Sequence, residues 1–407
     1  MPPATRQIVS TAHGPLRRLL LYFPREAMVR SGYRVVYADL LGKLPAATRL
    51  TVVAHPGAVD ALDQLLHESG RRATTTVIRS DLDLRFTVWA QDPCVVVQGN
   101  DEQTTFVTPA RFDREQDADA VELLARATSA DVQRSSLSFP GGDVLAGDDF
   151  VLLGWDCRRA TMDAPEHEAA AAASTETYRA ASAARCFQEL FAPDHRVRFV
   201  GTDRLLSHAR TRPIEVKGRE VVEILPGGGE GPHPLVHLDM FMTLAGRGAD
   251  GRYRLLVGSP ALADELLGRD VVDPELSAAC DDVAAQLLAE GFEVERNPLP
   301  LTFGDGRRRL DGEVRDVRLW YLATANNCLV QIDEVAGDHV WLPTYGHGAW
   351  RELTATDAVN RRIWEQLGFT VHELTSFHTF TQRFGALHCI AKELDRRPLG
   401  PADRGGK

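Results

Sequence analysis

A short stretch near the end of the chain, Phe384 to Leu394, places a cysteine at the start of an apolar run. Three earlier segments likewise carry polar side chains at the tip of an apolar run. Together the four segments contain Asp92, Asp143, His237, Asp239 and Cys389. A thiol, an imidazole and two carboxylates at one site can perform covalent chemistry on a cationic carbon. We therefore expect these segments to meet in the folded chain.

The same pattern, a polar residue followed by a short apolar strand, occurs five times along the chain. The polar residues are Asp92, Asp143, Asp239, Asn327 and Cys389. Two further segments, Val283 to Val294 and Arg362 to Val371, are near copies of one another. Each predicts an amphipathic helix, a glycine at its carboxyl end and then a strand. A ring of five such strand–helix modules would bring all five polar tips to one central end.

The remaining pattern alternates strands and helices. We expect strands over Leu50–His55, Thr75–Ile78 and Phe86–Trp89, helices over Ala58–Leu66, Asp117–Ala127 and Glu166–Leu190, and a hairpin over Asp143–Gly154. The glycine-rich segment Pro226–Pro232 lacks the Gly-Lys-Ser/Thr of a phosphate loop, so we interpret it as a flexible connection before His237.

Composition limits the class of protein. The 407 residues have a net charge of -11, which argues against nucleic acid as the main partner. The six cysteines contain no C-x-x-C pair and are widely spread, so six reduced thiols are expected. No apolar stretch approaches the length of a membrane span. These features favour a cytoplasmic protein without a membrane partner.

Four motifs carry a resemblance to a known superfamily, in the order in which that superfamily has them. They are Trp89-Ala-Gln-Asp92, Gly141-Gly142-Asp143, His237-Leu-Asp239 and Leu387-His388-Cys389. With them the chain, from about Leu50 to Leu394, resembles the guanidine-modifying, or pentein, superfamily. The resemblance implies an α/β fold, a five-fold pseudosymmetric ββαβ propeller with the active site at its central end. Residues 46–395 would form the catalytic domain, residues 1–45 would complete the propeller, and residues 396–407 would be a disordered tail.

The motifs of this chain resemble those of different families within that superfamily. Gln91, together with the run Ser376–Cys389, is similar to protein-arginine deiminases, whereas agmatine deiminases usually carry Arg where Gln91 stands. The Gly-Gly-Asp hairpin looks like arginine deiminases and dimethylarginine hydrolases, but Pro140 replaces their acidic residue. Val95 stands where animal protein-arginine deiminases place an acidic calcium ligand. We therefore expect no cofactor, and calcium, although possible, is not expected.

The resemblance also assigns roles to the catalytic residues. Asp92 and Asp239 would hold the two edges of a guanidinium through paired charge-assisted hydrogen bonds. Cys389 would attack the central carbon, and His237 would protonate the departing ammonia and then deprotonate the attacking water. His388, next to the nucleophile, would point to the opposite face of a strand and is interpreted as structural. The His233/His237 spacing is not that of a helical zinc motif, so no metal site is predicted.

Five further residues are candidates for substrate binding, each with an ordinary structural role as the alternative. They are Trp89, Arg111, Gly142, Asn327 and Arg383. Trp89 would wall the aliphatic stem of the substrate, Asn327 would hydrogen-bond it, and an arginine would bind a carboxylate or peptide carbonyl.

The leading hypothesis is hydrolysis of a peptidyl-arginine guanidinium to citrulline and ammonia through a covalent thiouronium on Cys389. One alternative is the same reaction on a small guanidine, such as agmatine or free arginine. An amidinotransferase, in which an amine replaces water, would use the same residues. A non-catalytic binding module on the same fold is the alternative from a different class. Neither the oligomeric state nor the pathway follows from the sequence.

Overall fold

The protein is described from a computed structural model that covers residues 6–99, 103–112, 114–163, 176–191, 196–202, 211–225 and 237–397. Part of the expected helix Glu166–Leu190, the glycine-rich loop, His233 and most of the expected tail lie outside these residues. Arg396, the first residue of that expected tail, is buried.

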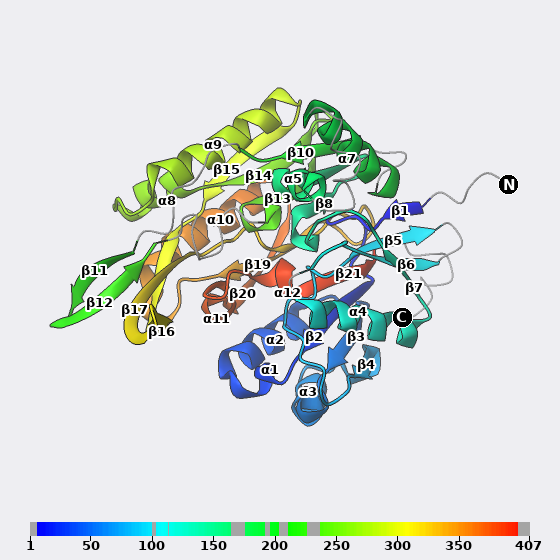
Figure 1. Ribbon diagram of the computed structural model, residues 1–407, viewed down its shortest axis with the longest axis horizontal. Helices are drawn as coiled ribbons and strands as arrows, with labels where there is room; N and C mark the ends of the chain where they lie inside the picture. Colours follow the sequence, from blue (N-terminus) through cyan, green and yellow to red (C-terminus); the bar gives the residue numbers. More distant parts are fainter. Residues whose placement is uncertain are drawn as a thin grey trace.

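Five sheets share one strand pattern, in which the first strand runs antiparallel to the second and the second runs parallel to the third. A helix or a helical pair follows each second strand and leads into the third (Figure 1). The strand triplets are β5 (Val95–Gly99), β6 (Thr104–Thr108) and β7 (Asp131–Arg134); β8 (Val144–Ala146), β9 (Phe150–Gly154) and β10 (Arg196–Val200); β13 (Met242–Arg247), β14 (Tyr253–Ser259) and β15 (Glu293–Pro298); β18 (Leu329–Gln331), β19 (His339–Thr344) and β20 (Thr370–Ser376); and β21 (Ala391–Asp395), β2 (Arg18–Phe23) and β3 (Arg49–Ala54).

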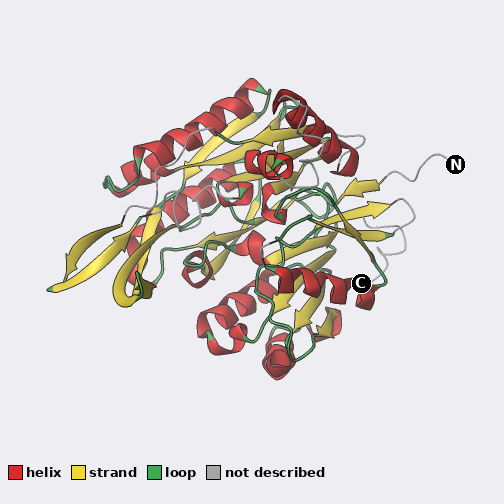
Figure 2. Cartoon of the chain, viewed as in Figure 1, coloured by secondary structure: helices red, strands yellow, loops and turns green. Residues whose placement is uncertain are grey.

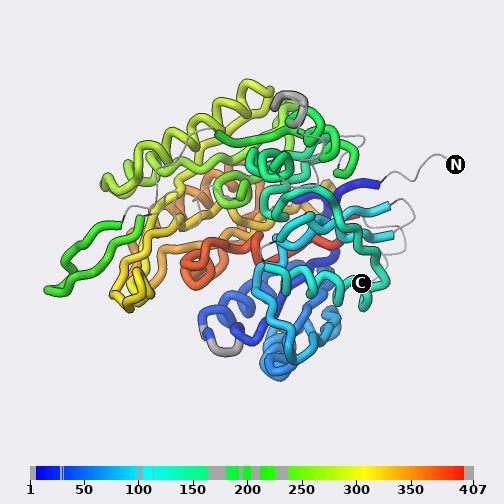
Figure 3. The backbone as a smooth tube through the Cα atoms, in the orientation of Figure 1, coloured from blue at the N-terminus to red at the C-terminus, as the bar shows by residue number. Residues whose placement is uncertain are grey.

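Two of these sheets have an additional edge strand. β1 (Arg6–Ile8) pairs with β5, and β4 (Thr75–Arg79) pairs with β3. The fifth sheet joins the two ends of the chain, because β21 lies beside β2 (Figure 3).

The helices cover the outer faces of the sheets (Figure 2). They are α1 (Glu26–Val29), α2 (Ser31–Lys43), α3 (Val59–Glu68), α4 (Glu115–Thr128), α5 (Trp155–Met162), α7 (Glu176–Phe191), α8 (Pro260–Leu267), α9 (Pro274–Ala289) and α10 (Thr354–Gln366). Single helical turns are η1 (Pro56–Ala58), η2 (Arg72–Thr74), η3 (Gly141–Asp143), η4 (Leu238–Met240), α11 (His378–Thr381) and α12 (Leu387–Ile390), and η5 (Gly348–Leu353) is a longer 3₁₀ segment with a kink at Trp350. Among the described residues, no helix is both long and apolar enough to cross a membrane.

A sixth sheet projects from the body (Figure 1). It contains β11 (Thr211–Val216), β12 (Arg219–Ile224), β17 (Glu313–Leu322) and β16 (Leu301–Leu310), in that order. The sequence patterns did not predict this sheet. The observed architecture is thus a mixed α/β fold of several small sheets, and closure of five of them into a five-fold propeller stays a prediction.

The two near-copied segments fold as predicted. α9 leads into β15 and α10 leads into β20, with Gly291 at φ 91° and Gly368 at φ 95° between them. Left-handed backbone of this kind is strained for residues with a Cβ, so glycine ends each helix.

One expected strand is absent: residues 80–94, all of which the structure describes, contain no strand. Asp117, at the start of α4, explains why Phe86–Trp89 is a loop. Its carboxylate accepts hydrogen bonds from the Thr87 amide at 2.6 Å and from the Thr87 hydroxyl at 2.7 Å. These bonds occupy backbone that a sheet would need, and they shape the approach to Asp92.

Candidate active site

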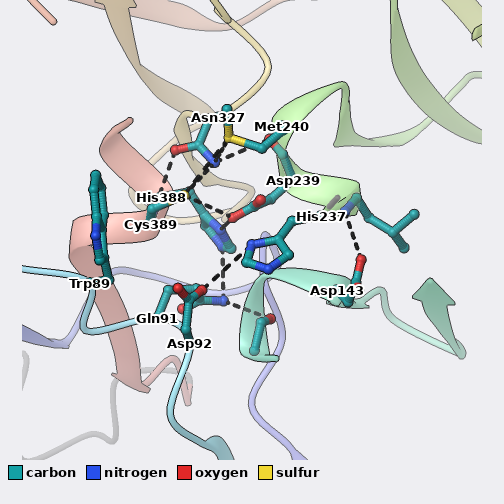
Figure 4. Close-up of polar contacts among 12 residues, drawn as sticks. Trp89, Gln91, Asp92, Asp143, His237, Asp239, Met240, Asn327, His388 and Cys389 are labelled. Carbon is teal, nitrogen blue, oxygen red and sulfur yellow. Dashed lines mark hydrogen bonds and ion pairs between the residues drawn. The ribbon is translucent and has the colours of Figure 1, made fainter. Parts of the chain in front are cut away.

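The five polar tips lie directly before β5, β8, β13, β18 and β21, and contacts between their segments join them in one cluster (Figure 4). The cluster is buried, since Asp92, Asp143, Asp239, Asn327 and Cys389 are each no more than 4% exposed. The predicted catalytic residues Asp92, His237, Asp239 and Cys389 are therefore brought together.

Cys389 is held by Asn327. The Asn327 side-chain amide Nδ2 donates to Cys389 Sγ at 3.1 Å, and its Oδ1 accepts from the backbone amides of Ala386 and Cys389 at 3.2 Å each. Nδ2 also donates to the backbone carbonyl of Asp239 at 3.2 Å. One amide thus fixes both the turn that carries the thiol and the segment that carries the carboxylate (Figure 4).

Asp239 contacts Cys389 and its neighbour His388. Its Oδ2 lies 2.8 Å from His388 Nδ1 and 3.6 Å from Cys389 Sγ. The expectation that His388 points away across a strand is wrong, because residues 387–390 form the helical turn α12 rather than a strand. A helical turn does not alternate side chains between two faces, so His388 and Cys389 can both contact Asp239.

Asp92 forms the other side of the site. Its Oδ1 lies 3.7 Å from His237 Nδ1, and its Oδ2 contacts Arg114 Nη2. His237 immediately precedes η4, a 3₁₀ turn that contains Asp239. His237 and Asp239 both face the cluster as expected, although a turn rather than a strand places them there.

Asp143 holds the backbone next to His237. Its Oδ1 accepts the Leu238 backbone amide at 3.0 Å, and its Oδ2 lies 3.5 Å from Cys157 Sγ. Burial raises the pKa of Asp143 to about 7. This carboxyl group positions the His237 backbone and adds a titratable charge next to the imidazole.

Within the cluster, two buried carboxylate oxygens have no hydrogen-bond partner among the described residues. They are Asp92 Oδ1 and Asp239 Oδ1. Leaving such acceptors unpaired in the interior is costly, so they suit a ligand that donates hydrogen bonds. The second oxygen of each carboxylate is already held by protein, by Arg114 and by His388 respectively. Asp92 Oδ1 and Asp239 Oδ1 therefore define where a cationic hydrogen-bond donor would bind.

The surroundings of Cys389 favour the protonated thiol. Burial raises the pKa of Cys389 well above its ordinary value, and the charges of Asp239 and Asp92 raise it further. A cation placed between the two carboxylates would offset their charge and favour the thiolate. Activation of the nucleophile would therefore accompany binding of a cationic ligand.

His237 is biased toward its charged form. Burial lowers the pKa of the imidazole, but Asp92, Asp143 and Asp239 together outweigh burial and raise it above its ordinary value. An imidazolium at this position can give a proton to a leaving group and can later take one from water.

Trp89 and Gly142 border the cluster. A Cβ at Gly142 would lie 2.7 Å from His237 Nδ1 and 3.2 Å from Asp239 Oδ1, so only glycine leaves room there. Trp89 is half-buried, packs edge-on to Phe380 with ring centroids 6.2 Å apart, and covers Gly385 on the approach to Cys389. Both positions are compatible with their predicted roles as substrate contacts.

Arg383 and Arg111 are not brought into the cluster. Arg383 Nη1 donates to Glu26 Oε2 at 2.6 Å and to the Tyr33 hydroxyl at 3.1 Å. Arg111 is exposed and lines a surface hollow beside α4. Their roles in substrate binding stay predictions.

Sequence reasoning missed Arg114 and gave His388 and Asp143 no role in the site. Arg114 precedes α4 without any motif, so nothing in its local sequence marks it. The expected strand over residues 387–390 would have pointed His388 away from the site, whereas the observed helical turn places it against Asp239. Asp143 was recognised as one of the five repeated tips, and that repeat was the signal that could have assigned it to the site.

The described residues contain no group of three or more His, Cys, Asp or Glu side chains arranged to hold a metal ion. The Val95 side chain is buried in β5 and has no oxygen atom that could bind calcium. All six cysteines are free.

No family model and no curated protein matches this sequence. Among solved structures, an agmatine deiminase from C. jejuni has a TM-score of 0.58 at 11% identity, with 96% of each chain covered. A DDAH from Pseudomonas aeruginosa, a mutant complexed with citrulline, has a TM-score of 0.37 at 13% identity, with 93% of this chain and 98% of that chain covered. The chain shares the fold of the agmatine deiminase, which confirms the predicted resemblance to guanidine-modifying enzymes at the level of fold.

Proposed function

We propose that this protein is a hydrolase that removes ammonia from a guanidinium group, with a small guanidine such as agmatine as the preferred substrate class. The observation that carries the proposal is the pair of buried oxygens without a hydrogen-bond partner, Asp92 Oδ1 and Asp239 Oδ1, beside Cys389 and His237. A planar guanidinium presents N–H donors on two edges, which suits two such acceptors.

The reaction follows from these positions. The Cys389 thiolate attacks the central guanidinium carbon and forms a tetrahedral adduct. The bond from that carbon to a terminal nitrogen breaks while the His237 imidazolium supplies a proton, so ammonia leaves and a thiouronium remains on sulfur. His237 then removes a proton from water, which attacks the same carbon. The carbon–sulfur bond breaks, which releases a ureido product and regenerates the thiolate.

Three observations support a small substrate over peptidyl-arginine. The nucleophile is only 2% exposed, and the shared fold is that of an agmatine deiminase. Arg383, the candidate for a substrate carboxylate or peptide carbonyl, is bound to Glu26. Peptidyl-arginine remains the second candidate because of the Trp89-Ala-Gln-Asp92 motif. An amidinotransferase would differ only in the acceptor that attacks the thiouronium.

We extend the proposal to the organisation and location of the chain. Residues 46–395 would act as one catalytic domain in the cytoplasm, without a cofactor, and residues 1–45 would complete the five-fold propeller. The position of β2 between β21 and β3 supports this division.

The experiment is ammonia release without added metal from agmatine, free arginine and a peptide with an internal arginine, each tested alone. We expect turnover of a small guanidine and none after Cys389→Ala. Turnover of the peptide alone would overturn the preference for small substrates. Release of ammonia only when an acceptor amine is present would favour the transferase.

A further inference from the structure

The carboxylate of Asp92 is already occupied by a guanidinium that belongs to the protein. Arg114 Nη2 contacts Asp92 Oδ2, and Arg114 is the residue directly before α4. The group on Asp92 is therefore chemically the same as the group proposed as substrate. A second guanidinium on that carboxylate would face the repulsion of the first.

Arg114 has a second carboxylate within reach. Its Nε lies 3.2 Å from Asp117 Oδ2. Asp117 is fully buried, and two hydrogen bonds from Thr87 fix its carboxylate. Arg114 could therefore leave Asp92 and remain paired with Asp117, so that its charge would stay compensated in both positions.

There is also space for the side chain to move. Arg114 and Asp117 line a surface hollow of about 910 Å³, together with Arg85, Thr87, Arg111 and Arg134 among others. The Arg114 side chain is 32% exposed, whereas that of Asp92 is 6% exposed. Arg114 thus lies between the hollow and the buried cluster, with the Phe112 ring 5.1 Å from its guanidinium carbon.

We propose that Arg114 is a built-in competitor for the cation site: it occupies Asp92 in the empty enzyme and moves toward Asp117 and the hollow when a cationic substrate binds. The proposal rests on the proposed function, since it takes a guanidinium or amidinium as the ligand of Asp92. Arg114 then sets the apparent affinity for such cations, because its charge on Oδ2 repels a second cation at Oδ1, and binding is strong only in the fraction of enzyme in which Arg114 has moved away.

The test measures access of a cation to Cys389 without turnover. Chloroacetamidine is a cationic alkylating agent: the Cys389 thiolate bonds to its methylene carbon, the carbon–chlorine bond breaks and chloride leaves. Iodoacetamide reacts in the same way, with loss of iodide, but is uncharged. Rates at Cys389 are read by peptide mass spectrometry in wild type, Arg114→Met, Arg114→Lys and Arg134→Met. Arg134 lines the same hollow and pairs with Glu122, so its variant is the matched control.

We expect Arg114→Met to raise the chloroacetamidine rate about tenfold and to change the iodoacetamide rate less than about twofold. Arg114→Lys, which keeps the competing charge, and Arg134→Met should both stay within about twofold of wild type with either reagent. A chloroacetamidine rate that is unchanged or lower in Arg114→Met would overturn the proposal, and a lower one would make Arg114 a positioning residue for Asp92. An equal rise with both reagents would also overturn it, because steric access would explain that result.

This measurement is separable from the proposed function. Alkylation needs Cys389 and the cation site but no hydrolysis. A selective rise with chloroacetamidine would therefore support the role of Arg114 even if agmatine, arginine and the peptide were all left unchanged by the enzyme.

Discussion

The two carboxylates of the site have opposite surroundings. Asp239 is held by His388, and Cys389 beside it is held by Asn327; all of these residues are at most 2% exposed. Asp92 is held by Arg114, a partly exposed side chain that lines a surface hollow. In the proposed reaction, the half of the site with Asp239, His388, Asn327 and Cys389, the fixed half, holds the reacting atoms. The half with Asp92 and Arg114, the adjustable half, would admit or refuse the cation.

The largest effect should come from the fixed half. We expect Cys389→Ala to lower ammonia release by about 10⁴-fold or more, because no other group can form the covalent intermediate. Cys186→Ala, at a partly buried thiol of α7, is the matched control and should retain nearly full activity. Steady-state ammonia assays on both variants measure this, and substantial turnover in Cys389→Ala would refute covalent catalysis by this residue.

Replacing each carboxylate by its amide compares the halves directly. Asp239→Asn should lower kcat by about 10³-fold, because it disturbs the nucleophile and His388 as well as the substrate. Asp92→Asn should act more on KM and lower kcat/KM by about 10²-fold, since Asp92 mainly holds the cation. Separate kcat and KM values for agmatine provide the measurement. Equal losses in kcat alone from the two variants would contradict the division into halves.

Replacing Asn327 should show how much its hydrogen bonds contribute to stability and to the placement of the Cys389 thiol. Asn327→Ala leaves the buried amides of Ala386 and Cys389 without their acceptor, which should lower the free energy of unfolding by about 1–3 kcal/mol. Looser placement of the thiol should also lower kcat about tenfold or more.

Asn326→Ala is the matched control for this variant. Asn326 is also buried and hydrogen-bonds Asn297, but it forms no hydrogen bond with the Cys389 thiol. We expect Asn326→Ala to lower the free energy of unfolding without lowering kcat. Similar kcat losses in both variants would mean that Asn327 acts only through stability, as urea unfolding beside the kinetics would show.

The sequence predicted the fixed half well and the adjustable half poorly. Cys389, Asp239 and Asn327 belong to a repeat in which a polar residue precedes an apolar strand, and repetition makes each copy recognisable. The local backbone structure was harder to predict. The segments 387–391 and 240–242 have the apolar pattern of strands, but they contain or follow the single helical turns α12 and η4. Arg114 was beyond sequence reasoning, since its pairing with Asp92 depends on how the loop before α4 lies against the 80–94 loop.

The pH dependence of activity should show whether the charge of Asp143 raises the pKa of His237. The carboxylates raise the pKa of His237, so its imidazolium persists above pH 6.5 and activity should fall only at higher pH, when that proton is lost. Asp143→Asn removes one of these charges, and the alkaline limb of kcat/KM should move to lower pH by about half a unit. The shift should be largest above pH 7, where the Asp143 carboxyl is ionised.

Asp305→Asn, in the projecting sheet, is the control and should leave the profile in place. An alkaline limb that does not move in Asp143→Asn would show that a group other than His237 sets it.

The smallest expected effect concerns Arg383, which lies outside both halves. Its guanidinium is bound to Glu26 and Tyr33, and an exposed ion pair of this kind contributes little, about 0–1 kcal/mol. Arg383→Met should therefore change KM for agmatine less than about twofold. Free arginine carries a carboxylate that agmatine lacks, so comparing KM for the two substrates isolates any binding of that group. A rise confined to arginine would show that Arg383 leaves Glu26 to bind the substrate carboxylate, which would add a third, movable contact to the site.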